Sequence, residues 1–370
     1  MTEFVGKGLK CLCGYAAPDN CFYEFNVTAA AEWSWNAAGR NEREFAAAWA
    51  TREGLAEPEK AADWAVTLGP VGWDVYGGRV PYYWVKGSLA GTIRVGHRPA
   101  LGSGAFTYFP TPGHFDADLA ACDRAMRLAH EVGAPALVEE TRVIRGYVEM
   151  LKAFYSFGEA IAPGRKMMEA ERRRAAEALA TAQRASVEVT EGLVAWGAAV
   201  APHLARTSRL TDTVKSAEQV MARASDMAAT LGVEDPERPY RAHWIGDWKT
   251  EDFADGPAQT KTWDVTKLVS GPGRYRVDFQ YDSGWHGARI KRVMLVAGPA
   301  SDASRREEVA RDVHDGSTGH QPRNTAYELT LASHDPKQSY FLIADLVGPK
   351  PGGPPERSGC AGHVTMRRVK

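Results

Sequence analysis

The sequence lacks an excess of charge, a long apolar run and a recognisable export signal. Lysine and arginine number 45 against 46 aspartates and glutamates, so no charged surface argues for nucleic acid or an anionic membrane as a partner. No apolar run approaches the ~20 residues that span a bilayer, and the N-terminus MTEFVGKGLK has no apolar signal-peptide core. We therefore expect no nucleic-acid and no membrane partner. Localisation stays open, because a sequence that starts within a domain would lack its export signal.

Cysteine is scarce and the common catalytic motifs are missing. There is no phosphate-binding P-loop, no nucleophile elbow and no zinc-binding HExxH. The five cysteines are odd in number and scattered, with no disulfide framework and no Cys-x-x-Cys pair: Cys11, Cys13, Cys21, Cys122 and Cys360. We expect no metal ion, no cofactor and no catalytic residue in this chain.

What is present is ordinary globular material in a chain long enough for two or three domains. Of the 370 residues, 44% are hydrophobic and 25% are charged, which suffices for buried cores. Changes of residue pattern divide the chain into segments 1–69, 70–115, 116–232 and 240–370. The first begins with an expected strand over 8–14 and a loop over 15–25, and three short helices follow: one capped by Thr28, one opened by an Asn41 and Glu44 capping box, and one from Pro58 to Gly69.

Aromatic residues dominate the second segment, 70–115, where the helical period disappears. They include Trp73, Phe106 and Phe109 among glycines and prolines. Aromatic faces stack on sugar rings, so this region could form a substrate platform. The alternative is that these large side chains are buried and seal a domain interface. Both interpretations stay open.

Helical periodicity returns from 116 to 232 and predicts an antiparallel bundle. The clearest apolar stripe, on the second of four expected helices, runs through Leu137, Thr141, Ile144, Val148, Leu151 and Tyr155. We expect the other three helices to start at Asp116 and end at Gly133, to span about 167–199, and to span about 208–231.

A linker is expected over 232–240, after which the apolar period becomes two. Alternation of this kind is typical of strands with one buried face. We expect strands at 275–281, 288–297, 326–331, 340–346 and 363–369, which together predict an antiparallel β-sandwich over 240–370.

The stretch NCFYEFNVTAAAEWSWNAAGR, residues 20–40, resembles the last strand, loop and helix of a glycoside hydrolase barrel, above all of family 20, the β-N-acetylhexosaminidases. Phe22, Tyr23 and Glu24 match that family's late-strand motif of an aromatic, a spacer and a glutamate. The run 29–35 matches its Ala-Ala-x-Ala-Glu-x-x-Trp helix.

This resemblance implies that residues 1–69 are the terminal remnant of a (β/α)8 barrel whose catalytic Asp-Glu pair lies ahead of this sequence. It also implies that Asn20, Tyr23 and Glu24 contact sugar. A carboxylate accepts up to four hydrogen bonds, and the aromatic neighbours of Glu24 would strengthen them by excluding water. The alternative role for Glu24 is a structural salt bridge. For Glu32 we expect a backbone bond or a pairing with Arg40.

The last segment resembles the galactose-binding-like jelly-roll modules that are appended to many glycoside hydrolases. The pattern WDVTKLVSGPGRYRVDFQYDSGWHGARIKRVMLVAG carries this resemblance. It implies sugar contacts from loops at one end of the sandwich. Trp285 is the main candidate, followed by His286, His314, Asp315 and His320. A sandwich that only braces the helical bundle remains the alternative.

Together these features predict the C-terminal portion of a carbohydrate-active enzyme that acts on N-acetylhexosaminides and is inactive alone. The expected partners are a carbohydrate substrate and a barrel domain, encoded upstream or separately, and the parent enzyme would be secreted or periplasmic. The alternative hypothesis is a non-catalytic glycan-binding or scaffolding protein that uses its β-sandwich.

Overall fold

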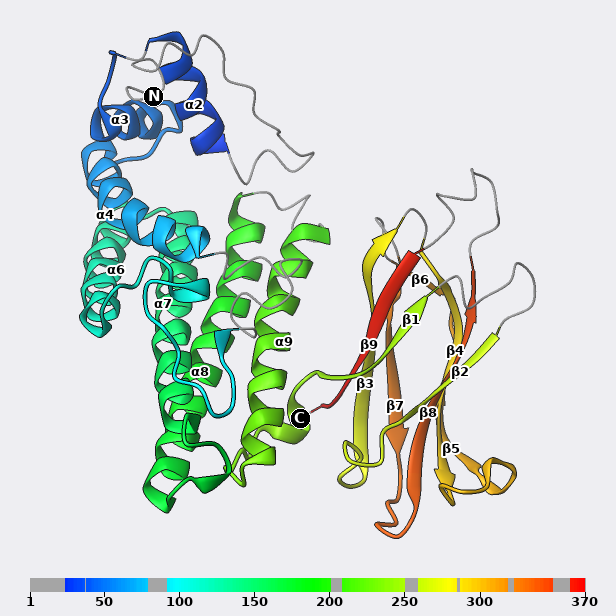
Figure 1. The fold of residues 1–370 in the computed structure, drawn as a ribbon. Helices are drawn as coiled ribbons and strands as arrows, with labels where there is room; N and C mark the ends of the chain where they lie inside the picture. Colours follow the sequence, from blue (N-terminus) through cyan, green and yellow to red (C-terminus); the bar gives the residue numbers. More distant parts are fainter. Residues whose placement is uncertain are drawn as a thin grey trace. The chain divides into compact units, whose positions relative to one another are not determined.

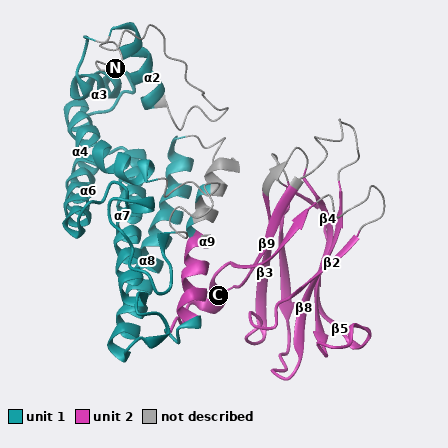
Figure 2. Ribbon diagram, viewed as in Figure 1, with its two compact units in different colours: residues 1–217, 230–233 teal, residues 218–229, 234–370 magenta. Residues whose placement is uncertain are grey.

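The computed structural model describes residues 24–36, 38–78, 92–200, 208–249, 259–284, 287–318, 323–348 and 360–369. These residues are helical in the N-terminal part of the chain and form antiparallel strands in the C-terminal part (Figure 1). Two compact units divide the chain, as Figure 2 shows. Unit 1 holds Met1–Ala217 and Thr230–Val233, and unit 2 holds Glu218–Ala229 and Glu234–Lys370. The predicted mixed α+β class is confirmed, while the strand expected over 8–14 lies outside the described residues.

The helices of the described residues follow one another with short breaks. They are α2 Glu24–Trp35, α3 Glu42–Arg52, α4 Pro58–Gly77, α6 Pro112–Val132, α7 Pro135–Ile161, α8 Glu169–Val200 and α9 Ser208–Thr230. Short 3-10 helices lie at η2 Gly104–Phe106, η3 Gly164–Lys166, η4 Arg238–Tyr240 and η6 Ala303–Arg305. The segment boundaries expected at 69 and 115 both fall inside unit 1, because α4 packs on α3 and on α6.

Helix α2 starts at Glu24, so the prediction of a loop through Phe25 and a start at Thr28 is wrong. Packing explains the earlier start. The ring of Phe25 lies edge-on to Phe45, with 5.3 Å between centroids, and to Trp49, with 5.1 Å. The side chain of Arg40 binds both carboxylate oxygens of Glu32 at 3.1 and 3.0 Å, as expected.

Helices α3 and α4 begin where the sequence predicts. Asn41 accepts from the Glu44 backbone while the Glu44 carboxylate accepts from the Asn41 backbone, which completes the capping box. The predicted end of α4 at Gly69 is wrong, since the helix continues through Pro70 to Gly77. Val71 and Val75 are buried on the same helix as Leu68, and this packing outweighs the hydrogen bond that Pro70 cannot donate.

Three of the four helices predicted for the bundle, α6, α7 and α8, pack together, with α7 against both neighbours, while α9 is divided between the two units. Helix α6 begins at Pro112, so the expected cap at Asp116 is wrong, because proline suits the first helical position. Gly133 ends α6 in the left-handed conformation, with φ 72°, as predicted. The predicted stripe on α7 is buried from Leu137 to Leu151, and its last residue, Tyr155, is partly buried.

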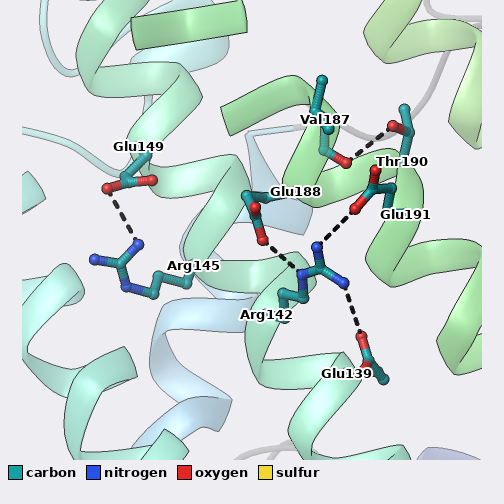
Figure 3. Close-up of polar contacts among 8 residues, drawn as sticks. All are labelled: Glu139, Arg142, Arg145, Glu149, Val187, Glu188, Thr190 and Glu191. Carbon is teal, nitrogen blue, oxygen red and sulfur yellow. Dashed lines mark hydrogen bonds and ion pairs between the residues drawn. The ribbon is translucent and has the colours of Figure 1, made fainter. Parts of the chain in front are cut away.

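Helices α7 and α8 approach each other closely at two glycines. A Cβ on Gly146 would lie 2.8 Å from Val189 Cγ2, and one on Gly192 would lie 3.0 Å from Val143 Cγ2. Ion pairs flank this contact (Figure 3): the guanidinium of Arg142 on α7 binds Glu188 and Glu191 on α8, at 2.6 and 2.9 Å. The helix pair therefore combines a close backbone approach with a charged border.

Unit 2 contains two antiparallel sheets that share one core. The sheet orders are β1-β9-β3-β7 and β2-β8-β4-β5, with β6 paired to β4. Strand bounds are β1 His243–Lys249, β2 Gln259–Asp264, β3 Gly273–Gly284, β4 Arg289–Gly298, β5 Glu307–Asp312, β6 Gly316–Ser317, β7 Ala326–Leu331, β8 Ser339–Val347 and β9 Cys360–Arg368. The alternation that predicted β3 is real, because Tyr275, Val277 and Phe279 point into the core. Strands β1, β2, β5 and β6 were not predicted.

The change from unit 1 to unit 2 at Val233 and Glu234 falls within the linker expected over 232–240, and Asp235 of that segment forms a buried ion pair with Arg241. The guanidinium of Arg241 binds both carboxylate oxygens of Asp235 at 2.9 Å, and the side chains are 4% and 5% exposed. The hydroxyl of Ser225, on α9, donates to the same carboxylate. Arg367 on β9 binds Glu218 on α9 at 3.0 Å. These contacts join the second half of α9 to the strands of unit 2.

Candidate functional sites

The four main sugar-contact residues predicted from the sequence have no described side chains. Asn20, Tyr23 and Trp285 lie outside the described residues, and Glu24 is placed only by its backbone, as the first residue of α2. Glu24 therefore lies in the first turn of a helix and does not end a strand. Its contact with sugar stays a prediction.

Six strand ends of the sandwich meet at one end of unit 2, and we call them the rim. In one sheet, the last residues of β1 and β3, Lys249 and Gly284, pair with the start of β9 at Ala361 and Cys360. In the other sheet, the first residues of β2 and β4, Gln259 and Arg289, pair with the last residues of β8, Leu346 and Val347. Only a few residues separate Gly284 from Arg289, so the two sets of strand ends lie at the same end of the sandwich (Figure 1).

Trp285 and His286 lie between β3 and β4, in the segment that joins two of these strand ends. His320 lies between β6 and β7 and, like them, is outside the described residues. Short connections at one end of a sandwich are where such folds carry binding residues. The rim is therefore the part of unit 2 with which the predicted sugar contacts are compatible.

His314 and Asp315 are already engaged within the protein. The Nδ1 of His314 lies 2.9 Å from Asp312 Oδ1, its Nε2 lies 3.1 Å from the Asn324 carbonyl, and its ring stacks on Tyr327 at 4.0 Å. Asp315 accepts from Lys291 at 2.7 Å, and this bond lowers the pKa of Asp315. Both ring nitrogens of His314 face protein acceptors, so His314 is a structural residue and a poor candidate for sugar contact.

The described aromatic side chains of residues 70–115 differ in burial, and the role of a substrate platform stays a prediction. Phe106 and Phe109 are fully buried, and Phe109 stacks on Phe115 of α6 at 4.6 Å. These two residues seal the interior of unit 1. Trp73 is 63% exposed, and its ring lies edge-on to that of Tyr108, with 6.0 Å between the ring centroids. The aromatics at 82–84 lie outside the described residues.

A cluster of ionisable side chains joins α4 to α6, and we call it the Asp-His-Asp cluster. Asp74 lies in the last turn of α4, while His114 lies in the first turn of α6 with Asp118 one turn further on. The Nε2 of His114 is 3.0 Å from Asp74 Oδ2 and 3.9 Å from Asp118 Oδ1. One nitrogen and two carboxylate oxygens lie within 4.8 Å of one another, which makes this a possible metal-binding group.

Asp118 is the buried member of the cluster, with a side chain 10% exposed. Its Oδ2 is buried and has no hydrogen-bond partner among the described residues. The pKa of Asp118 is raised to about 6, chiefly by burial and also by the negative charge of Asp74, while His114 acts in the opposite direction. A carboxylate in this position is costly to ionise unless a positive charge comes close.

Sequence reasoning missed this cluster, although part of its signal is readable. His114 and Asp118 are four residues apart on one helix, so their side chains share a face. Asp74 gives no such signal, because it lies 40 residues away from His114 and on a helix that was expected to end at Gly69.

Comparisons with known proteins add no relative. No protein-family model matches the chain, and no curated protein matches it. No helix within the described ranges has both the length and the apolar character needed to cross a membrane.

Proposed function

We propose that this chain is the C-terminal, accessory portion of a carbohydrate-active enzyme of the glycoside hydrolase class, and that its β-sandwich recognises sugar. The rim carries this proposal. Six strand ends meet there, and Trp285 directly follows one of them, Gly284, in the sequence. Two antiparallel sheets on one core are also compatible with a jelly-roll module of the galactose-binding-like kind.

The chemistry of glycoside cleavage would come from a partner barrel domain. Family 20 enzymes, which residues 20–40 resemble, use an acid residue beside an aspartate that orients the acetamide of the substrate. Under this proposal residues 1–69 close such a barrel, Glu24, Tyr23 and Asn20 complete a subsite for an N-acetylhexosaminide, and the chain alone does not hydrolyse glycosides.

Glycan-array binding of the whole chain tests the sandwich. We expect binding to N-acetylhexosamine-containing glycans, and a loss of at least about tenfold in affinity for Trp285→Ala, since one aromatic stacking contact can contribute about 1.5 kcal/mol. Trp244→Ala is the matched control, because Trp244 is 47% exposed and lies at the opposite end of β1 from the rim. Equal loss in both variants, or no binding by the parent chain, would contradict a sugar site at the rim.

Turnover of a nitrophenyl N-acetylglucosaminide tests the division of labour. The chain alone should release no nitrophenol. Robust hydrolysis by the purified chain would refute the accessory role, because the catalytic acids would then lie within these residues. Co-elution with a separately expressed barrel on size exclusion would support the pairing.

A second candidate is a glycan-binding or scaffolding protein that has no barrel partner. The packing of α2 on α3, and of α3 on α4, within the same unit as the bundle favours it. It predicts that Glu24→Ala has no effect on glycan binding and that no barrel co-elutes with the chain.

A further inference from the structure

The Asp-His-Asp cluster has the ligand set of a metal site. Imidazole nitrogen and carboxylate oxygen are both good ligands for zinc, and two carboxylates would neutralise its charge. Three protein ligands would leave a fourth tetrahedral position for solvent. Water can reach this position, because the His114 side chain is 35% exposed and the Asp74 side chain 17%.

The distances within the cluster suit a small ion. Zinc lies about 2.0 to 2.2 Å from nitrogen and oxygen ligands, so tetrahedral ligand atoms are about 3.3 Å apart. The Nε2 of His114 is 3.0 Å from one carboxylate oxygen and 3.9 Å from another, which brackets that separation. Small side-chain rotations would therefore bring all three atoms into one coordination sphere.

The buried oxygen of Asp118 is the independent observation that points to a ligand. Its side chain is 10% exposed, and its Oδ2 has no partner among the described residues. Its other oxygen faces His114. Buried carboxylate oxygens in native proteins usually have a donor, an ordered water or a cation as partner, and a metal ion bound by the cluster would supply one to Asp118.

We propose that Asp74, His114 and Asp118 bind one divalent transition-metal ion, with zinc as the best fit. The ion would link the last turn of α4 to the start of α6. This site lies wholly in unit 1, so it is independent of the sugar site proposed for unit 2.

Titration of the tag-free whole chain with zinc chloride, followed by calorimetry, tests the proposal. We expect one ion to bind per chain, with an affinity that falls at least about tenfold in Asp118→Asn and in His114→Ala, since each change removes a ligand. His130→Ala is the matched control, because His130 is an exposed histidine in the last turn of the same helix, and it should bind like the parent.

Two further measurements keep the result independent of folding defects. Cobalt bound in place of zinc should give the visible absorption of a tetrahedral site in the parent and in His130→Ala but not in Asp118→Asn. Zinc at a hundredfold excess over its Kd should raise the Tm of the parent by roughly 5 °C and leave Asp118→Asn unchanged. Asp118→Asn preserves side-chain volume, and circular dichroism should show a parent-like fold.

The contrary outcomes are equally clear. Zinc binding that survives both Asp118→Asn and His114→Ala would place the ion elsewhere in the chain and overturn the proposal. Absence of binding by the folded parent would do the same.

Discussion

Each unit of the molecule buries an aspartate, and the two are treated in opposite ways. In unit 2, both oxygens of Asp235 accept from Arg241, Ser225 donates to one of them, and the backbone of Glu237 donates to the other. In unit 1, Asp118 has one oxygen without any partner among the described residues. Burial acts to raise the pKa of both, but the bonds from Arg241 and Ser225 outweigh it and lower the pKa of Asp235, whereas the pKa of Asp118 rises to about 6.

The difference separates a structural carboxylate from one that is available to a ligand. A buried carboxylate with a full set of donors is neutralised inside the fold and has no capacity left. A buried carboxylate with too few donors remains a strong acceptor that its surroundings do not satisfy. Glu140 on α7 differs from both, because it is half-buried and has a donor: burial raises its pKa to about 7, and a hydrogen bond from Trp196 acts to lower it.

The largest expected effect comes from breaking the satisfied aspartate. Asp235→Asn leaves the Arg241 guanidinium buried without its counter-charge, and the free energy of unfolding should fall by about 3 to 5 kcal/mol. Urea denaturation followed by circular dichroism measures this. Asp315→Asn, which removes an exposed partner of Lys291, should leave the free energy of unfolding almost unchanged. Equal changes in the free energy of unfolding in Asp235→Asn and Asp315→Asn would show that the burial of Asp235 does not increase its contribution to stability.

An effect of intermediate size should appear in the pH dependence of the free energy of unfolding, because of Glu140 in unit 1. A carboxyl whose pKa is higher in the folded than in the unfolded chain favours folding at low pH, and this advantage is lost as the pH rises. Between about pH 4.5 and 7 the free energy of unfolding should fall by roughly 2 kcal/mol, after allowance for partial exposure of the side chain.

Urea denaturation across that pH range measures this loss. Glu140→Gln should remove it, while Glu177→Gln, at an exposed position on α8, should retain it. An identical pH profile for the parent and Glu140→Gln would disprove the assignment to Glu140.

The smallest expected effect has the opposite sign to the first. Without added metal at pH 7, Asp118→Asn should raise the free energy of unfolding by about 1 kcal/mol, because it removes a buried charge that lacks donors. Denaturation in the presence of a chelator measures this gain. A loss of stability of similar size to that of Asp235→Asn would mean that the two aspartates are equally satisfied.

Much of the fold was readable from local patterns that packing later reinforced. The stripe on α7, the Asn41 capping box and the alternation in β3 each gave the correct element, because burial and local preference agree at those positions. The strand over 326–331 matches β7 in both bounds. The sandwich was thus predictable from its central, strongly alternating strands.

The errors arose where tertiary contacts overrode a local signal. Gly69 and Pro70 look like a helix end, yet the burial of Val71 and Val75 carries α4 through them. Strands β2 and β5 were missed because their exposed faces are rich in charged and polar residues, and only pairing with β8 and β4 defines them. The ion pair of Asp235 with Arg241 was not predicted, because a buried ion pair and an exposed one look alike in the sequence.

The candidate sites were harder to predict than the fold. The four main residues expected to touch sugar rest on a family resemblance, and their side chains are not described in the structure. The Asp-His-Asp cluster depends on the meeting of two helices whose ligands are far apart in the sequence, so only the His114 and Asp118 spacing could have indicated it.

The arrangement of the strand ends lets the sandwich tolerate changes of sequence and length at the rim that its interior would not tolerate. Within the described ranges the ladders of both sheets end at Lys249, Gln259, Gly284, Arg289, Val347 and Cys360, so replacing what joins these positions leaves the pairs described for these ranges in register. Insertions and deletions there would cost little beyond the entropy of closing a longer loop. A sandwich of this kind can therefore acquire new binding specificities when the segments that connect its strands at the rim are exchanged.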